Sequence, residues 1–190
     1  MSENARSRHT SLWLLGALCA APVVASYLVF YLAPPDTHSN YGELLATRPL
    51  PEARLQLVDG TAFELGRLKG KWLLLMVDSG NCDEFCRRKL FTLRQLRLAQ
   101  GKDQGRIERA WLISDTATPS AAAVSEYQGT WLVRAAGSEL LKQLPAERPP
   151  ADYLYIVDPL GNLVLRYPRD ADPLKIIKDI ARLLRTSRIG

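Results

Sequence analysis

The sequence predicts a mixed α/β fold, in which a sheet is flanked by helices and preceded by one N-terminal transmembrane helix. Segments patterned as strands alternate with segments patterned as helices, and this alternation is typical of a sheet covered on both faces. Ahead of them, residues 10–35 contain no charged side chain. The 190 residues suffice for one domain with a core of its own plus an anchor.

The predicted anchor is the apolar stretch of residues 11–33. A helix rises about 1.5 Å per residue, so this stretch is long enough for a hydrocarbon core of about 30 Å. Two arginines within residues 1–10 precede it, and the positive-inside rule then places this N-terminus in the cytoplasm. A signal peptide cut after Ala25 is the competing interpretation, but the apolar run continues through residues 27–33. We therefore expect a single-pass protein of the inner (cytoplasmic) membrane with its domain on the periplasmic side.

The part of the chain after the anchor divides into a tether and a domain. Residues 34–51 contain four prolines and many small or polar residues, which predicts a tether. The exported α/β domain is then expected over residues 52–190.

The first half of this domain opens with a hairpin, because two short alternating runs flank Asp59-Gly60. Residues 72–77 form a nearly unbroken apolar run, which is typical of a strand buried on both faces. Residues 82–100 carry a broad apolar stripe opposite arginines and lysines, which predicts an amphipathic helix. Residues 107–114 are the next expected strand.

The second half continues the alternation. Its expected elements are a helix at 121–128, a short strand at 131–133, a short helix at 138–144, a hairpin of strands at 153–157 and 163–167, and an amphipathic helix at 173–184. Ser138 is the expected N-cap of the short helix. We interpret Trp72, Trp111 and Trp131 as core residues rather than partner-binding ones.

Composition excludes several functional classes. The net charge of +5 is spread along the chain without a basic block, so no nucleic-acid partner is expected. There are three cysteines and two histidines, and no histidine follows His38. The absence of a Ser-His-Asp set, a zinc signature or a phosphate loop excludes most hydrolases and zinc enzymes. Cys19 lies in the predicted anchor and is interpreted as an apolar thiol.

Cys82 and Cys86 directly follow the predicted central strand and stand at the start of the next predicted helix. The carboxyl ends of strands are where α/β sheets present their sites, and a helix N-terminus stabilises a thiolate. Residues four apart share one face of a helix, so the sulfurs can form a disulfide or hold one Cu(I) ion. A structural disulfide and two buried core residues are the competing interpretations.

Charged residues flank this pair. Asp83 and Glu84 oppose a thiolate, whereas the three bases at positions 87–89 favour one. Asp78 ends the central strand and is interpreted as a cap for the following loop, with proton acceptor as the other possible role.

The order of these features resembles the Sco/SenC family over about residues 55–184. The matching features are the Asp59-Gly60 hairpin, Gly70-Lys71 ahead of the central strand, the Cys-x-x-x-Cys pair, and Val157-Asp158-Pro159 with Gly161 before the last strand. Members of that family are thioredoxin-fold, membrane-tethered copper chaperones and thiol-disulfide reductases that serve assembly of the dinuclear copper centre of cytochrome c oxidase. The resemblance implies a thioredoxin-like domain, and Cys82 and Cys86 as both catalytic thiols and Cu(I) ligands. It implies the copper-bearing oxidase subunit, or another assembly factor, as partner.

One ligand of that family is missing. The family's third copper ligand is a histidine, and the matching position here is near Pro150, where no histidine stands. His38 is interpreted as a solvated tether residue rather than a replacement ligand. Two thiolates alone hold Cu(I) but lack the imidazole that suits Cu(II), so copper binding should be weaker, Cu(I)-selective or absent. A proline before this strand is often cis in thioredoxin-like domains, and Pro149 or Pro150 is either that residue or part of an ordinary trans turn.

Three hypotheses follow. The first is a Sco/SenC-like assembly factor in which Cys82 is the exposed attacking thiol and Cys86 the resolving one, acting by thiol-disulfide exchange, by Cu(I) transfer, or by both. The second is a general exported thiol-disulfide oxidoreductase of the cytochrome c maturation type, which the lack of a Cys-x-x-Cys motif disfavours. The third is a non-enzymatic assembly scaffold whose cysteine pair is structural.

Overall fold

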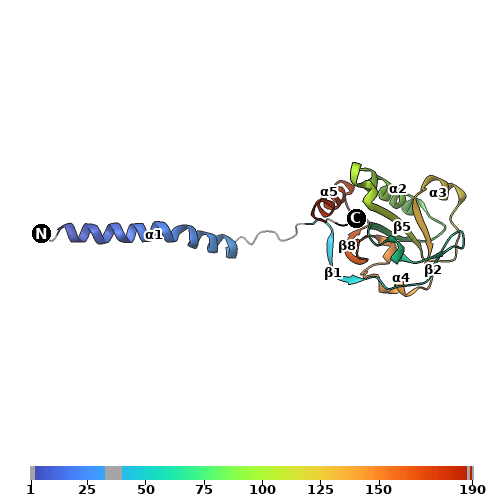
Figure 1. Cartoon of the computed structure of the whole chain (residues 1–190), viewed down its shortest axis with the longest axis horizontal. Helices are drawn as coiled ribbons and strands as arrows, with labels where there is room; N and C mark the ends of the chain where they lie inside the picture. The colour runs from blue at the N-terminus through green and yellow to red at the C-terminus, as the bar shows by residue number, and fades with distance from the viewer. Residues whose placement is uncertain (1–2, 33–39, 188, 190) are drawn as a thin grey trace. The chain divides into compact units, whose positions relative to one another are not determined.

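The computed structural model describes residues 3–32, 40–187 and 189, in two units: Met1–Ser39 and Asn40–Gly190. In the first unit, α1 (Glu3–Leu32) is one helix with Pro22 inside it (Figure 1). Its described apolar side chains, such as Trp13 and Leu18, are exposed. Among the described residues, none of the helices combines the length and the hydropathy that crossing a membrane requires.

The second unit is built on one mixed sheet of eight strands, in the order β1-β8-β7-β4-β5-β6-β2-β3. The strands are β1 (Glu43–Pro49), β2 (Leu55–Leu57), β3 (Ala62–Phe63), β4 (Trp72–Asp78), β5 (Ile107–Ile113), β6 (Thr130–Arg134), β7 (Tyr153–Val157) and β8 (Asn162–Pro168). The neighbours β4, β5 and β6 are parallel, whereas β7 is antiparallel to β4 and β8 to β7. The predicted mixed α/β architecture is confirmed.

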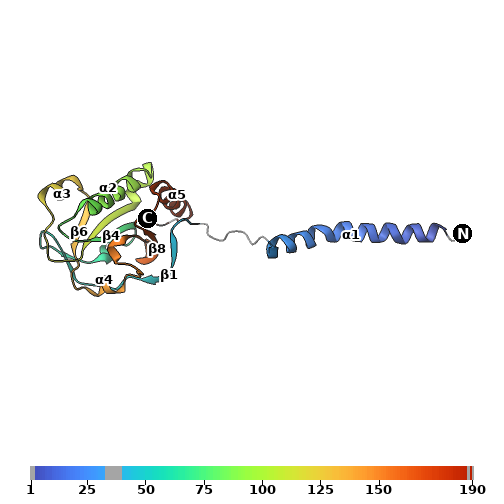
Figure 2. The ribbon, with the colours of Figure 1, turned by 180° about the vertical axis from the view of Figure 1, so that it is seen from behind.

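Helices cover both faces of this sheet. They are α2 (Glu84–Leu98), α3 (Ala121–Glu126), α4 (Glu139–Gln143) and α5 (Pro173–Thr186), with short 3-10 turns η1 (Leu65–Leu68), η2 (Gly101–Arg106) and η3 (Pro150–Asp152). Figures 1 and 2 show α2, α3 and α5 on one face and α4 on the other. One half of the core therefore joins the sheet to α2 and α5, and the other half joins it to α4 and the β2–β3 hairpin.

Core burial follows the alternation of side chains along the strands. In β4, Leu74 and Met76 face α2, while Leu73 and Leu75 belong to the other half of the core. All four are at most 3% exposed. A strand buried on both faces reads as a continuous apolar run, which is why the sequence placed this strand correctly. The N-cap prediction is also confirmed, because the Ser138 side chain accepts a hydrogen bond from the Leu141 amide.

The predicted tether was too long at its C-terminal end, because β1 lies inside residues 34–51 and pairs with β8. The buried Arg166 guanidinium holds this edge strand through two contacts to the Glu43 carboxylate, of 2.6 and 2.7 Å. The Gly42 amide also donates to the Asp179 carboxylate over 2.8 Å. These partners lie more than 120 positions apart in the sequence, so no local pattern indicates the strand. Residue 33 of the predicted anchor and residues 34–39 of the predicted tether, including His38, lie outside the described residues.

Candidate functional site

The candidate site lies at the carboxyl end of the central strand, where β4 ends at Asp78. The loop between β4 and Cys82 packs against the loop that follows β5. The Gly80 amide donates to the Asp115 carboxylate over 3.0 Å. A Cβ atom at Gly80 would collide with the carbonyl oxygen of Ala117, so only glycine permits this close approach.

Cys82 and Cys86 form a disulfide, with their Cα atoms 5.0 Å apart. The expected meeting of the two sulfurs beyond the central strand is therefore found. Cys86 lies in the first turn of α2, whereas Cys82 precedes the helix. Its φ of 32° is in the left-handed region, which residues with a side chain rarely adopt.

The prediction that both cysteines share one face of a helix is wrong. Asp83 is the N-cap, and its carboxylate accepts a hydrogen bond from the Cys86 amide over 2.8 Å. Aspartate is among the best N-caps, so the helix begins at Glu84, two residues after Cys82. The disulfide therefore joins the loop to the helix, and α2 presents only one of its two sulfurs.

The disulfide is nearly enclosed. Cys82 is 6% exposed and Cys86 is fully buried. Both pack in the same part of the core as Met76, Trp111 and Tyr127. The expectation of an exposed attacking thiol is therefore not met in the oxidised form, although Cys82 is the one cysteine of the pair with any accessible surface. The same packing places Trp111 in the core, as predicted.

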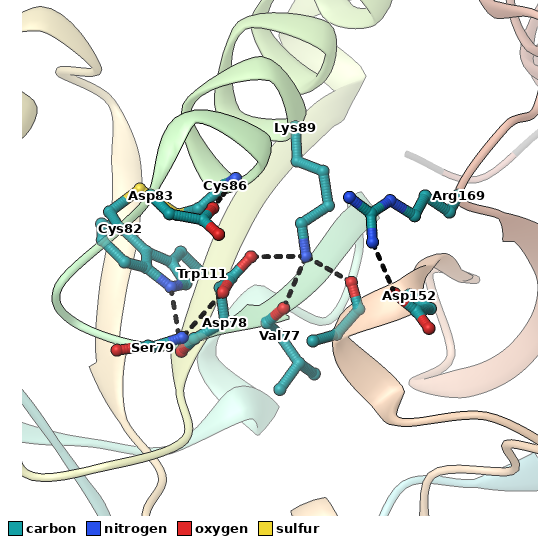
Figure 3. A network of polar contacts seen from close by, with 11 residues as sticks. Val77, Asp78, Ser79, Cys82, Asp83, Cys86, Lys89, Trp111, Asp152 and Arg169 are labelled. Carbon is teal, nitrogen blue, oxygen red and sulfur yellow. Dashed lines mark hydrogen bonds and ion pairs between the residues drawn. A yellow bond between two sulfur atoms is a disulfide. The ribbon is translucent and has the colours of Figure 1, made fainter.

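A buried ion pair lies beside the disulfide (Figure 3). The Lys89 ammonium projects from α2 and contacts the Asp78 carboxylate over 2.7 Å. It also donates to the carbonyl oxygen of Val77 over 2.8 Å and to that of Ala151. Lys89 thus ties the helix that carries Cys86 to the end of β4 and to the η3 turn before β7.

The ion pair bears on two predictions from the sequence. Burial lowers the pKa of Lys89, while hydrogen bonding and the charge of Asp78 oppose this shift. That the three bases at positions 87–89 favour a thiolate stays a prediction, and the structure shows that Lys89, one of the three, is paired with Asp78. Asp78 caps the loop as predicted, because its other carboxylate oxygen accepts from the Ser79 amide over 2.9 Å. Lys89 falls on the apolar stripe of α2, three positions after Cys86 and four before Leu93, and that periodicity was the signal that could have placed it inside.

A small cavity of about 180 Å³ opens next to this pair, lined by side chains of α2, η3 and the segment after β8. The Arg169 guanidinium lies 3.7 Å from the centroid of the Phe85 ring and 3.6 Å from the Asp152 carboxylate. The wall of this cavity therefore carries a cation and an aromatic ring. Pro149 and Pro150 precede β7 near this cavity. Both follow trans peptide bonds, because the described residues contain no cis peptide bond, so the ordinary trans turn is the alternative that is found.

Among the described residues at this site, the donor set for a metal is limited to the two sulfurs. No three histidine, cysteine, aspartate or glutamate side chains gather into a metal-binding group within the described part of the chain. Asp83 and Glu84 are exposed, and Asp83 is engaged as the N-cap. Once reduced, Cys82 and Cys86 would supply two thiolates, which suit Cu(I).

The comparison with family models decides the classification. Residues 72–187 match the model described as "Transmembrane-like, thioredoxin-like, C-terminal domain", which is more than half of the chain. The chain belongs to this family. The thioredoxin-like fold expected from the sequence is therefore confirmed. No curated protein matches the chain in sequence.

Solved structures of copper-binding proteins share the fold. Yeast Sco1 with copper bound has a TM-score of 0.60 and 19% identity, covering 74% of this chain and 96% of its own. Arabidopsis thaliana ScoI with copper bound has a TM-score of 0.59 and 17% identity, covering 74% and 100%. The thioredoxin domain of a thiol-disulfide oxidoreductase from Bacteroides vulgatus has a TM-score of 0.51 and 17% identity, covering 74% and 99%. The expected similarity to Sco/SenC proteins is thus found at the level of the fold.

Proposed function

We propose that this protein is a membrane-anchored, Sco/SenC-like assembly factor for cytochrome c oxidase that acts by thiol-disulfide exchange through Cys82 and Cys86. The observation that carries the proposal is the disulfide at the carboxyl end of β4, between a left-handed loop residue and the first turn of α2. A non-glycine residue in a sparsely populated conformation costs about 1–3 kcal/mol and is typical of functional sites.

The proposed reaction begins from the reduced pair. The Cys82 thiolate attacks a disulfide of the partner, and a mixed disulfide forms as one partner thiolate leaves. The Cys86 thiolate then attacks the Cys82 sulfur, which restores the internal disulfide and releases the partner as a dithiol. Two electrons pass to the partner, so an exported dithiol reductant must regenerate the pair after each cycle.

Cu(I) transfer is the second candidate function of the same residues. It is supported by the fold shared with two copper-bound Sco structures and by the two thiolates that reduction would supply. Copper is then cargo, held by Cys82 and Cys86 and passed to thiolates of the oxidase subunit. Because the domain has no histidine, retention should be selective for Cu(I).

The membrane anchor is part of the proposal and rests on the sequence. Residues 11–33 are uncharged and follow two arginines, which favours a cytoplasmic N-terminus and a periplasmic domain in the inner membrane. We expect the protein to resist alkaline extraction from the membrane. We also expect protease to reach the domain only after the outer membrane is opened. Release into the soluble fraction would contradict it.

Trapping of the mixed disulfide tests the exchange reaction. All variants carry Cys19→Ser, which removes the free thiol of α1. The reduced Cys86→Ser protein should accumulate a covalent adduct with the disulfide form of the oxidase's copper-bearing subunit, because the resolving thiol is absent. The matched Cys82→Ser variant should form little adduct, because Cys86 is fully buried.

The competing hypotheses give different results in this assay. Equal capture of an unrelated exported disulfide protein would favour a general oxidoreductase. A wild-type pair that stays oxidised in strong thiol reductants, with no adduct in either variant, would favour the structural scaffold. Titration of the reduced wild type with Cu(I) and a competing chelator tests the cargo function, and copper retention unchanged by Cys82→Ser would refute it.

A further inference from the structure

Arg109 is a buried arginine that is held by one hydrogen bond. It lies in β5 on the face that packs against α2, and it is 4% exposed. Its Nη2 donates to the carbonyl oxygen of Gln128 over 2.9 Å. Its Nε and Nη1 are buried and have no hydrogen-bond partner among the described residues. Unpaired donors on a buried charged group cost folding free energy, so we expect a hydrogen-bond acceptor to bind this guanidinium.

Two more arginines of α2 lie near this group. Arg97 donates through Nε to the carbonyl oxygen of Ile107 over 2.8 Å. Ile107 and Arg109 are two positions apart on β5, so Arg97 is bound to the strand that carries Arg109. Arg94 is one helical turn before Arg97 and is exposed. Burial, and then the charges of Arg97 and Arg94, lower the pKa of Arg109.

No ion pair in the described part of the chain neutralises this cluster, because none includes Arg94, Arg97 or Arg109. The charge of Glu108 partly opposes the lowering of the Arg109 pKa. Its carboxylate, however, points to the opposite face of the sheet, where it accepts from the Trp131 indole over 3.1 Å. A water molecule can satisfy the unpaired donors of Arg109, whereas an anion would also offset the positive charge of the cluster.

We propose that Arg94, Arg97 and Arg109 form a binding site for a phosphate-type oxyanion. Guanidinium forks match pairs of oxygen atoms, so an oxyanion fits this set better than a halide. Arg94 is exposed and has no hydrogen-bond or ion-pair partner among the described residues, so its side chain can turn without breaking a contact and admit the anion. Gly129 allows the Arg109 guanidinium to pack closely on the inner side, because a Cβ there would lie only 3.3 Å from Arg109 Nη2. This site is separate from the disulfide, which lies at the opposite end of α2.

Thermal unfolding of the full chain in detergent tests the site. Inorganic phosphate is titrated at constant ionic strength, with sodium chloride making up the balance. The unfolding temperature of the wild type should rise and saturate with phosphate, because a ligand that binds only the folded state stabilises it. Arg94→Gln should weaken the apparent affinity about tenfold, as the loss of one charge-assisted contact implies. Arg88→Gln is the matched control, since it removes one exposed charge from the same helix and should leave the affinity unchanged.

Arg109→Met provides an independent arm. This variant should lose the phosphate response and keep a folded domain, because methionine removes the buried unpaired donors and fits an apolar site. The proposal is overturned if phosphate does not raise the unfolding temperature of the wild type. It is also overturned if Arg94→Gln and Arg88→Gln respond to phosphate in the same way. Reconstitution into vesicles then separates two sources of the oxyanion. If phosphatidylglycerol stabilises the protein more than phosphatidylcholine does and abolishes the response to free phosphate, the oxyanion is a lipid headgroup. If the response to free phosphate persists in phosphatidylglycerol vesicles, the oxyanion is a soluble phosphate.

Discussion

Replacement of Lys89 by methionine should destabilise the domain strongly, although lysine is a charged residue on a helix surface position in most proteins. The ammonium contacts one carboxylate and two carbonyl oxygens, and the side chains of Lys89 and Asp78 are only 6% and 14% exposed. Removing one partner of a buried ion pair costs about 3–5 kcal/mol, because the remaining charge stays buried without compensation. Asp78 keeps some access to water, so we expect a loss near the lower end, about 3 kcal/mol of unfolding free energy.

Urea unfolding of the full chain in detergent, followed by tryptophan fluorescence, measures this loss. Arg88→Met is the matched control, because its exposed side chain pairs with Glu84 on the same helix, and it should cost less than about 1 kcal/mol. The double variant Asp78→Asn/Lys89→Met should recover part of the loss, because no buried charge is then left unpaired. If Lys89→Met and Arg88→Met cost the same, the ion pair is solvated and the reasoning is refuted.

Three further predictions concern other parts of the domain. Burial raises the pKa of the Tyr155 phenol, so its contribution to stability is present below pH 10 and is lost as the pH rises above it. Tyr155→Phe should therefore flatten the alkaline decline of the unfolding free energy, and an unchanged decline would contradict this. Asp83→Ala removes the N-cap of α2 and should cost about 1 kcal/mol in urea unfolding. It should also speed reduction of the disulfide by dithiothreitol, and an unaltered rate would show that the cap does not hold the loop. Glu43→Gln weakens the contact to Arg166, and should cost about 1 kcal/mol and speed amide exchange in β1 but not in β4.

The elements from β2 to α5 could be predicted because their signals are local. An apolar run predicted β4, turn residues predicted the hairpins, and the period of apolar positions predicted α2 and α5. The edge strand β1 could not be found this way, because it is held by Arg166, Asp179 and the ladder to β8. Long-range pairing of this kind leaves no periodic trace in a segment that is exposed along most of its length.

The site could be predicted only in part, because some of its features have local signals in the sequence and others depend on long-range contacts. The position of Cys82 and Cys86 after the central strand followed from sequence order, but the start of the helix depended on which residue caps it. The pair Asp78–Lys89 joins residues eleven positions apart on different elements, and no local pattern marks Asp78 as the partner of Lys89. Arg109 was not singled out because a lone arginine in an apolar strand has no local pattern that marks it as buried.

The environment of the disulfide assigns different roles to its two sulfurs. Cys86 is fully buried and its backbone is fixed by the N-cap, and the next turn of the helix is bound through Lys89 to β4 and η3. Cys82 lies in a loop, retains some accessible surface, and has a φ in the left-handed region that residues with a side chain rarely adopt. Reduction would remove the covalent link that holds Cys82 against the helix, and relief of about 1–3 kcal/mol of backbone strain would then favour movement of the loop and not of the helix. The cysteine that a partner reaches first is therefore the one on the movable side, while its resolving partner stays in place.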